Sequence, residues 1–470
     1  MSQRYDLVVI GAGSAGLSAV SFALRLGMRV ALVERDRVGG DCTWTGCVPS
    51  KALVHAAAVA HTVRHAREFG VPVTGSHVDF PAVMAGVRAA IERVYAHETP
   101  AVLRAHGADV LHGEARFLNS HVLSVDGVRL TARRFVIATG ADPVRPNISG
   151  LGVVPYLTYQ NLFALTDLPR TLLVVGGGSI GVEMSQALQR LGAQVTLLHR
   201  GERILPVADA EASSVLHSAL QREGVDVRTR SPVEEVTAAG GAVRAIVRGQ
   251  PVEGDALLVA TGRRPRLRGL DLERAGVGAS ERGVEVDETL RTSARHIYAA
   301  GDVTGSYQYT HYAGWQGFLA ARNALLPGTM RAARNSVPWA VFTDPEIAQA
   351  GLTEEQAREG GEKIRVYRRP AERIDRAQTL GETEGFLKLI VRPDGTLLGA
   401  VVVGGAASEV ANELAVALEQ GLKLSQLARS IHIYPTYGIA IQQAASEAVT
   451  AGTLRGWRGR TLRALAKWLP

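Results

Sequence analysis

The sequence predicts an α/β protein with two copies of one strand–turn–helix–strand unit, followed by a separate α+β domain. Residues 7–34 recur as residues 172–199, with their glycines and an Arg-Leu-Gly step in register. A short apolar strand ending in Ala-Thr-Gly follows each copy, at residues 135–140 and 257–262. From Ser336 onward this pattern stops and a different mixture of strands and helices begins.

Each copy of the repeat consists of an apolar strand, a GxGxxG turn, a helix of about a dozen residues and a second apolar strand. The first glycine of such a motif makes the turn, the second lets the backbone approach a pyrophosphate, and the third lets helix and strand pack closely. The pyrophosphate lies at the helix N-terminus, where free N–H groups and the helix dipole favour anions. Two copies in register therefore predict two Rossmann-like dinucleotide-binding sites. The motif glycines are Gly11, Gly13 and Gly16 in the first copy and Gly176, Gly178 and Gly181 in the second.

The two copies differ at the end of the second strand, where such folds bind the ribose. Glu34 ends the first copy with a carboxylate, which can accept hydrogen bonds from ribose hydroxyls as FAD and NAD need. His199 is the equivalent residue in the second copy, and Arg200 and Arg203 follow it, where they could pair with a 2′-phosphate. Because Arg35 is equivalent to Arg200, the missing acid is what decides. We expect NADPH as the cofactor rather than NADH.

Further strand ends supply candidate cofactor-binding residues. The Ala-Thr-Gly turns contribute Thr139, Gly140 and Gly262. A third strand ends at Gly301 and Asp302, and an acid at that place suits the ribityl or pyrophosphate region of a flavin. We therefore assign the first repeat and these strand ends to a flavin site.

The C-terminal part of the chain differs in texture. Strands at 386–391 and 396–403, which we expect to alternate between apolar and polar faces, precede an alanine-rich helix at 409–418. This pattern predicts a separate α+β domain. The last stretch, 455–470, is basic and carries large apolar residues. It could make weak peripheral contact with an anionic membrane surface, or form a solvated or dimer-packed terminal helix.

Length and composition exclude several classes of protein. The 470 residues suggest about three domains, and 46% hydrophobic with 21% charged residues is typical of a globular chain. Two cysteines are too few for a disulfide-rich scaffold or a four-cysteine zinc site. The net charge is +7, but the basic residues are scattered among acids and no nucleic-acid-binding motif accompanies them. We expect no nucleic-acid partner.

The uncharged segment 7–24 resembles a signal peptide or a short membrane helix in composition. Its glycines stand at the spacing of the nucleotide-binding turn, and Arg4 is the only basic residue before it, with Asp6 beside it. We interpret the segment as strand, turn and helix, and expect a cytoplasmic protein.

Both cysteines lie in one CxxxxC segment, Cys42 and Cys47, just before an alanine-rich helix that Pro49 helps to start. A helix N-terminus stabilises a thiolate and lowers its pKa, so this pair suits redox chemistry. Two structural thiols or two metal ligands are the alternatives, although a cysteine-only metal site would lack ligands. We interpret the pair as a readily reducible redox disulfide. His61 and His65 have metal-binding spacing but no third ligand nearby, so we expect surface histidines and no resident metal.

The CxxxxC segment with its following Val-Pro-Ser-Lys, the two nucleotide units, the Ala-Thr-Gly turns and Gly301-Asp302 together resemble the class I flavoprotein disulfide reductases, or pyridine nucleotide-disulfide oxidoreductases. The wording of the chain is most similar to the mercuric reductase-like and dihydrolipoamide dehydrogenase-like branch. The resemblance implies a homodimer. It also implies a domain order of FAD-binding (1–148), NAD(P)-binding (149–265), FAD-binding again (266–335) and dimerisation (336–450), before the basic amphipathic tail (451–470).

The resemblance further implies a path for electrons. NADPH would reduce FAD, and FAD would reduce the Cys42–Cys47 disulfide, with Cys47 as the flavin-proximal thiolate and Cys42 as the thiol that meets the acceptor. Lys51 and Glu183 match the family's ion pair beside flavin and nicotinamide, in which each residue lowers the cost of burying the other. The expected acceptor is a small disulfide or a thiophilic metal ion.

One departure from the family concerns the acid/base group. Related disulfide reductases carry His-x-His-Pro-Thr-x-x-Glu, whose second histidine is the acid/base, whereas Tyr434 and Ile439 stand here in place of that histidine and the glutamate. Tyrosine is a poor base at neutral pH, because its pKa lies near 10. His432, two residues away, is either a substitute or a structural residue. The alternative function is therefore a diaphorase, quinone reductase or transhydrogenase-type flavoenzyme in which the cysteines are not essential. A redox sensor without turnover is a further reading.

Overall fold

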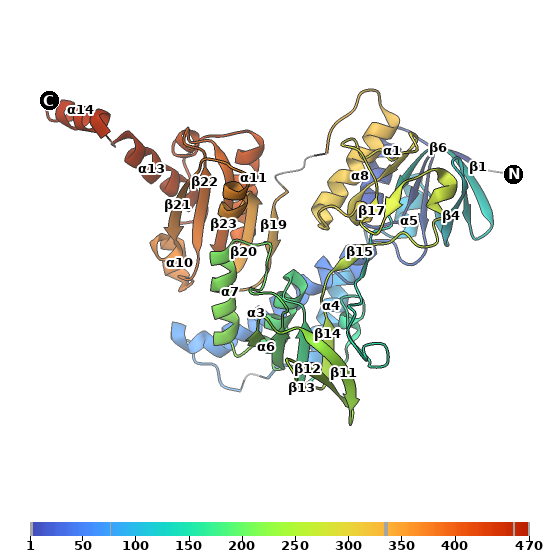
Figure 1. Cartoon of the computed structure of the whole chain (residues 1–470), viewed down its shortest axis with the longest axis horizontal. Coiled ribbons are helices and arrows are strands. Elements are labelled where there is room, and N and C mark those ends of the chain that lie inside the picture. The colour runs from blue at the N-terminus through green and yellow to red at the C-terminus, as the bar shows by residue number, and fades with distance from the viewer. Residues whose placement is uncertain (1–2, 76, 333–336, 455, 469–470) are drawn as a thin grey trace. The chain divides into compact units, whose positions relative to one another are not determined.

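The computed structural model describes residues 3–75, 77–332, 337–454 and 456–468. The chain divides into two compact units, Met1–Arg200 with Ser231–Ala332, and Gly201–Arg230 with Ala333–Pro470. Both combine helices with sheets, as Figure 1 shows.

The first unit is built on a sheet of strand order β3-β2-β1-β6-β5-β4, with β18 added beside β6. Its strands are β1 (Gln3–Ile10), β2 (Val30–Glu34), β3 (Asp109–His112), β4 (Ala115–Asn119), β5 (Val122–Val125), β6 (Val128–Ile137) and β18 (Ile297–Ala299). β1, β2, β3, β6 and β18 are parallel to their neighbours in this core, and β4 and β5 extend it antiparallel. Helices α1 (Ser14–Arg25) and α8 (Thr310–Leu325) pack against each other and bury their alanines beside the sheet. Strands far apart in sequence thus share one core.

The second repeat forms a parallel sheet of its own within the first unit. Its elements are β8 (Thr171–Val175), α6 (Ser179–Leu191), β9 (Gln194–Leu198) and β14 (Ala256–Val259). β8 pairs in parallel with both β9 and β14, as β1 does with β2 and β6. The internal repeat of the sequence is therefore a structural repeat, and the predicted α/β class is confirmed.

Both glycine turns require glycine for the same steric reasons. Gly11 and Gly176 have φ of 102° and 118°, and a Cβ on either would lie 2.3 Å from the alanine carbonyl oxygen of the Ala-Thr-Gly turn beside it. A Cβ on Gly16 or Gly181 would lie 1.8 Å from the carbonyl oxygen of the first glycine. These contacts hold the N-terminus of α1 or α6 tight against its strand.

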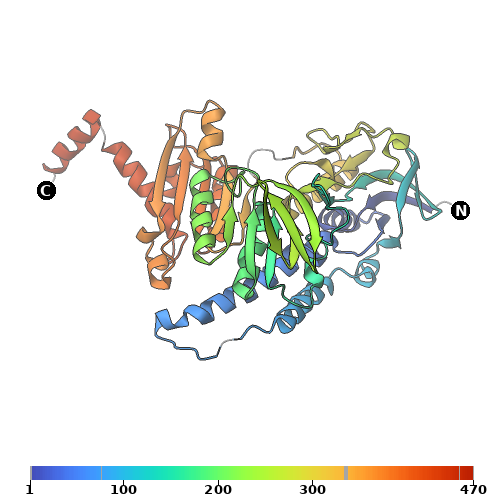
Figure 2. The ribbon, with the colours of Figure 1, turned by 60° about the horizontal axis from the view of Figure 1, so that its bottom comes forward.

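The cysteine segment leads into a long helical hairpin of the first unit. It comprises α2 (Gly40–Trp44), α3 (Cys47–His65), η1 (Ala66–Phe69), α4 (Phe80–Tyr95) and α5 (Pro100–Ala105). α3 packs against both α4 and α6, and Figure 2 shows α3 and α4 as two blue helices joined by a loop. The helix begins at Cys47 itself, so Pro49 lies in its first turn rather than at its start.

Shorter elements complete the first unit. They are β7 (Ala141–Pro143), η2 (Leu162–Ala164), β11 (Val233–Ala239), β12 (Ala242–Val247), β13 (Gln250–Gly254), β15 (Arg263–Pro265), η3 (Leu272–Ala275), β16 (Ala279–Ser280), β17 (Gly283–Val284) and η4 (Gly301–Thr304). β11, β12 and β13 form an antiparallel meander, and β15 pairs with β7.

The second unit is an antiparallel sheet of order β19-β20-β23-β22-β21 with helices around it. Its elements are α7 (Ala210–Arg222), β10 (Asp226–Arg228), β19 (Trp339–Val341), β20 (Glu346–Gly351), α9 (Glu354–Glu359), β21 (Arg365–Pro370), η5 (Ala371–Arg373), α10 (Asp375–Leu380), β22 (Phe386–Val391), β23 (Leu397–Gly404), α11 (Ala407–Glu419), α12 (Leu424–Leu427), α13 (Ile439–Thr453) and α14 (Gly456–Ala466).

The expected alternation of buried and exposed residues along β22 is wrong, because all of its residues are buried. One face, with Leu387 and Leu389, packs into the core that α11 covers. On the other face the ammonium of Lys388 lies 2.9 Å from a carboxylate oxygen of Asp209, which caps α7. An ion pair in place of a solvated face explains why the sequence pattern alone misled.

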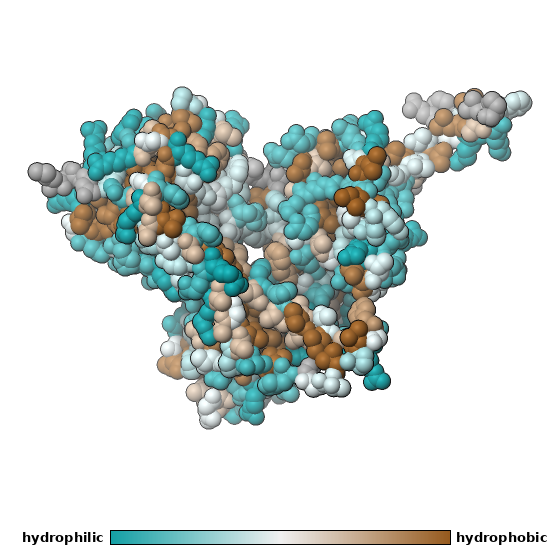
Figure 3. Space-filling view, turned by 180° about the vertical axis from the view of Figure 1, so that it is seen from behind, coloured by the Kyte–Doolittle hydropathy of each residue, from teal (hydrophilic) through white to brown (hydrophobic). Residues whose placement is uncertain are grey.

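The C-terminal tail bears on the predicted membrane contact. No helix among the described residues is long and apolar enough to cross a membrane. Leu462, Leu465 and Trp468 are exposed, and Figure 3 shows hydrophobic beside hydrophilic side chains on this helix. Arg455 and residues 469–470 lie outside the described residues. Peripheral membrane contact and a cytoplasmic location stay predictions.

Candidate active site

The two cysteines lie at the junction of α2 and α3. Cys42 is in α2 and Cys47 is the first residue of α3, after the N-cap Gly46, which has no side chain to occupy the helix N-terminus. Both thiols are free and share a hydrogen bond. The sulfur of Cys47 also lies 3.1 Å from the hydroxyl oxygen of Thr310 at the start of α8. The sequence gives no signal for Thr310, because it lies on a distant helix.

The surroundings stabilise a thiolate on Cys47. Its pKa is lowered to about 6, chiefly by the hydrogen bond from Cys42 and then by the Thr310 hydroxyl and the charge of Lys51, while burial and Glu183 oppose the shift. The pKa of Cys42 is raised, first by the same hydrogen bond and then by burial. The pair therefore holds one proton, on Cys42, and one negative charge, on Cys47. That asymmetry matches the roles expected from the sequence, which remain to be tested.

An ion pair lies beside the thiolate. Lys51 is one turn after Cys47 on α3, and its ammonium donates to a carboxylate oxygen of Glu183 on α6 at 2.8 Å. The Glu183 side chain is only 6% exposed, so its charge depends on this partner. Because α3 packs against α6, the structure brings a residue of the cysteine helix to a residue of the second repeat.

A charged cluster that sequence analysis missed lies beside Cys42. The guanidinium of Arg263 lies 2.6 Å from a carboxylate oxygen of Asp41 and 2.6 Å from one of Asp302, and its side chain is 19% exposed. The hydroxyl of Tyr159 donates to the same Asp41 oxygen at 3.1 Å. Burial raises the pKa of Asp302, against the charge of Arg263. Arg263 thus ties the cysteine segment to the predicted flavin-binding aspartate.

The first and second repeats use their ribose-position residues alike. The carboxylate of Glu34 accepts the backbone N–H of Ala12 at 2.7 Å, and Nδ1 of His199 accepts that of Gly177 at 3.1 Å. Each thereby anchors the residue after the first motif glycine. A ring nitrogen that accepts an N–H carries no proton, so His199 brings no negative charge where Glu34 does.

The neighbouring predicted cofactor residues divide into two groups. Arg200 is exposed, whereas Arg203, in the second unit, is committed to Glu355 at 2.9 Å. The remaining residues line strand ends: Thr139, whose hydroxyl donates to the Arg266 carbonyl; Gly140, Gly262 and Gly301, which all have positive φ; and Asp302. The structure does not extend the Arg200 cation to Arg203 as one paired site.

The residues present fit two dinucleotides. The N-caps of α1 and α6 are Gly13 and Gly178, and neither helix start carries a side-chain cap. Their first N–H groups are therefore open to a pyrophosphate, which is the usual partner of such a helix N-terminus. The glycine contacts described above leave no room for any other side chain there.

The acid/base position has its own partners in the second unit. The Tyr434 side chain is exposed, and its hydroxyl donates to a carboxylate oxygen of Asp375 at 3.0 Å, which raises its pKa above the ordinary value of 10. His432 lies with Nε2 2.8 Å from Glu413 on α11. Glu413 thus takes the place of the carboxylate partner that Ile439 lacks, a pairing that spacing in the sequence does not indicate.

Comparison with known proteins places these features. The family described as pyridine nucleotide-disulphide oxidoreductase matches residues 5–317, and its dimerisation domain matches residues 337–445. A mercuric reductase from Streptomyces lividans is 38% identical over 453 residues, which cover 94% of this chain and 95% of the relative. A dihydrolipoyl dehydrogenase from Thermus scotoductus is 37% identical over 457 residues, with 94% and 97% coverage.

Solved structures of the same kind are similar over nearly the whole chain. The HOCl-induced flavoprotein disulfide reductase RclA from Escherichia coli is 31% identical with a TM-score of 0.85, covering 94% of this chain and 99% of that one. LpdA from Mycobacterium tuberculosis is 30% identical with a TM-score of 0.87, covering 95% and 99%.

Proposed function

The chain belongs to the pyridine nucleotide-disulphide oxidoreductase family, and on that premise we propose that it carries electrons from NADPH through FAD to the Cys42–Cys47 pair and on to a thiophilic metal ion or a small disulfide. As a member of this family it is an FAD-dependent enzyme that uses a pyridine nucleotide. The observation that carries the proposal is the thiolate environment of Cys47 at the start of α3, beside the Lys51–Glu183 pair.

Each residue of the site has a defined task in this proposal. Bound FAD would supply the two-electron relay between nicotinamide and disulfide. The open N-termini of α1 and α6 bind the two pyrophosphates. Lys51, held by Glu183, keeps a positive charge near the Cys47 sulfur, and Thr310 donates to it. After reduction Cys42 retains its proton until an acceptor reaches it, because its pKa is raised.

The acid/base position favours a metal ion over a disulfide. Attack on a disulfide expels a thiolate, which related disulfide reductases protonate through a histidine. The Tyr434 hydroxyl, bonded to Asp375, keeps its own proton at neutral pH and is a poor base. A soft metal ion binds cysteine thiolates directly and has no such leaving group. The relatives include mercuric reductases, and one RclA structure is a Cu(II) complex.

The preference for NADPH rests on His199. A neutral ring anchors the glycine turn without the carboxylate that would repel a 2′-phosphate, and the exposed Arg200 follows it. Arg203 is left out of this part of the proposal because it pairs with Glu355. The family match of residues 337–445 to a dimerisation domain supports a homodimer.

Direct transfer from flavin to a quinone is the second candidate. It is favoured by the same substitution at Tyr434, since a flavin that reduces its acceptor directly needs neither that residue nor the cysteines.

One experiment separates the two candidates. NADPH oxidation by the FAD-loaded enzyme is measured with Hg(II), Cu(II), a small disulfide and a quinone as acceptors, for the natural protein and for C42S. We expect metal-ion reduction to fall to background in C42S while quinone reduction persists. Full metal-ion reduction in C42S would refute the proposed path, and loss of activity with every acceptor except quinone in the natural protein would establish the second candidate.

A further inference from the structure

A second cavity lies in the first unit, at the edge of the sheet away from the glycine turns. It has a volume of about 570 Å³ and is lined by residues at or before the starts of parallel strands, among them Asp6, Met28, Arg134 and Arg295. The glycine turns follow the carboxyl ends of those strands, at Gly11 for β1. In open α/β sheets nucleotides bind at the carboxyl ends, so this cavity is separate from both dinucleotide sites.

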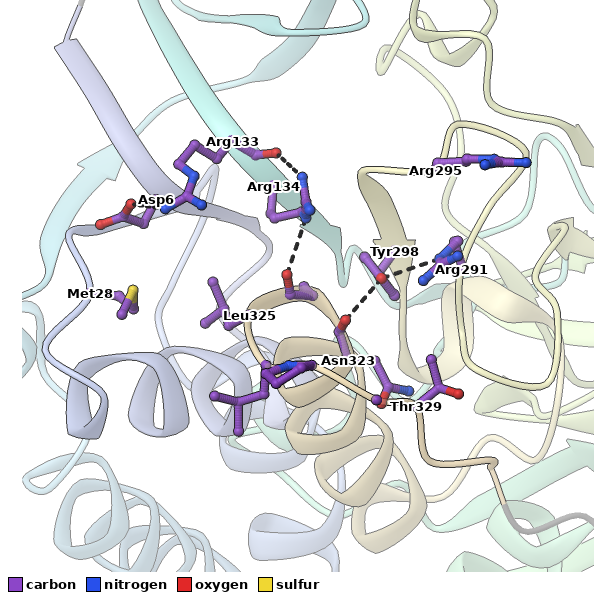
Figure 4. A pocket seen from close by; sticks show the side chains of 14 residues that line it. Asp6, Met28, Arg133, Arg134, Arg291, Arg295, Tyr298, Asn323, Leu325 and Thr329 are labelled. Carbon is purple, nitrogen blue, oxygen red and sulfur yellow. Dashed lines mark hydrogen bonds and ion pairs between the residues drawn. The ribbon is translucent and has the colours of Figure 1, made fainter.

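The lining of this cavity is strongly basic. It contains four arginines and, as its only carboxylate among the lining residues, Asp6. The arginines come from two separate segments, as Figure 4 shows, with Arg134 and Arg291 on either side of Tyr298. They are Arg133 and Arg134 on β6, and Arg291 and Arg295 in the segment before β18.

The hydrogen bonds of these arginines explain their positions but use only part of each guanidinium. Arg134 donates through Nε to the carbonyl of Ala324 at 3.1 Å, and Arg291 donates through Nε to the Tyr298 hydroxyl at 3.2 Å. Tyr298 in turn donates to the Asn323 carbonyl at 3.0 Å. The negative C-terminal end of α8 is thus satisfied from within. Among the described residues, the terminal nitrogens of Arg291 and the whole Arg295 side chain make no hydrogen bond or ion pair.

We propose that this cavity binds the oligophosphate group of a small molecule. Arginine presents two N–H groups in a fork that matches phosphate oxygens, and several guanidiniums from two sides suit a chain of phosphates better than one carboxylate. The volume falls within the range of small-molecule sites and exceeds the needs of a single phosphate. Met28 and Leu325 add an apolar wall for an organic portion.

The test measures binding with the dinucleotide sites already filled. FAD-loaded enzyme saturated with NADP⁺ is titrated calorimetrically with tripolyphosphate, with ATP and with citrate. We expect tripolyphosphate and ATP to bind and citrate to bind at least tenfold more weakly. ATP binding more tightly than tripolyphosphate assigns a role to the apolar wall, and equal affinity assigns the energy to the phosphates. Absence of binding heat for both phosphates, or equal binding of citrate, overturns the proposal.

Matched variants then place the site. R133Q with R295Q removes two lining charges whose side chains hold no backbone group of α8, and we expect binding to weaken by about tenfold or more. R129Q is the control, because Arg129 is an exposed arginine of the same strand β6 that does not line the cavity. NADPH turnover should be the same in all three proteins. Unchanged affinity in the double variant overturns the assignment, and circular dichroism checks that the variants are folded.

Discussion

Cys47 carries a charge that four neighbours on three helices control. Cys42 from α2, Lys51 from α3 and Thr310 from α8 all favour the thiolate, and the net result is a pKa of about 6. Lowering of an acid's pKa means that the thiolate predominates above that pH and is lost below it. The chemistry of the pair therefore depends on tertiary contacts as much as on the CxxxxC spacing.

The thiolate should be visible as a pH-dependent absorbance. In the reduced, FAD-loaded enzyme we expect the long-wavelength band of a thiolate next to flavin to be complete at pH 8 and to fall to half near pH 6 as Cys47 takes up a proton. T310V removes one hydrogen bond to the sulfur, so its midpoint should be higher. A spectrophotometric pH titration measures both. A midpoint near the ordinary thiol pKa in the natural protein would contradict the assignment.

Arg263 is expected to matter for stability because it lies between two carboxylates. In R263Q, Asp41 and Asp302 lose the cation that binds both, and breaking such a partly buried pair costs about 3 kcal/mol. Protonation relieves an unpaired carboxylate, so the loss should shrink as pH falls. Thermal denaturation from pH 5 to 8 measures this effect. R264Q, at the exposed neighbouring arginine, is the control, and equal stability of the two variants would refute the role.

His199 offers a direct test of nucleotide preference. H199E places a carboxylate where Glu34 stands in the first repeat, so it can still accept the Gly177 N–H. We expect the ratio of kcat/KM for NADPH over NADH to fall by about tenfold or more, which corresponds to about 1.4 kcal/mol. Steady-state kinetics with both nucleotides measure the ratio. A natural enzyme that prefers NADH would refute the premise.

At the scale of elements, local sequence signals predicted the glycine turns and the repeat well. Steric requirements at Gly11 and Gly176 act within one strand–turn–helix unit, so their spacing survives in the sequence. The Arg263 cluster and the His432–Glu413 pair join segments far apart in the chain, and no spacing reports them. The pattern of β22 misled for the same reason, since Lys388 is buried only because α7 supplies Asp209.

The glycine turns should be intolerant of even one methyl group. In G16A the new Cβ would lie 1.8 Å from the carbonyl oxygen of Gly11, so α1 must move away from β1. We expect this variant to purify with little FAD. G86A is the control, because the space around that helical glycine of α4 is open and alanine favours helix by about 1 kcal/mol. Flavin absorbance per protein measures occupancy, and full FAD content in G16A would contradict the packing argument.

At the scale of the whole molecule, the second unit leaves large apolar side chains exposed close together in sequence. Ile431 and Ile433 are 94% and 80% exposed, next to Tyr434. Monomeric proteins rarely expose such apolar groups together, so a partner surface is expected, and a second copy fits the dimerisation-domain match.

The dimer can be tested by mass. Light scattering after gel filtration should give twice the chain mass of 50.0 kDa for the natural protein. I431D with I433D places two charges on the exposed apolar segment and should shift the protein to the monomer mass, while I433V alone should leave the dimer intact. Because Tyr434 lies in the same segment, loss of the dimer should be accompanied by loss of any activity that depends on that position. A natural protein of single-chain mass would contradict the dimer, and with it any role for this segment across subunits.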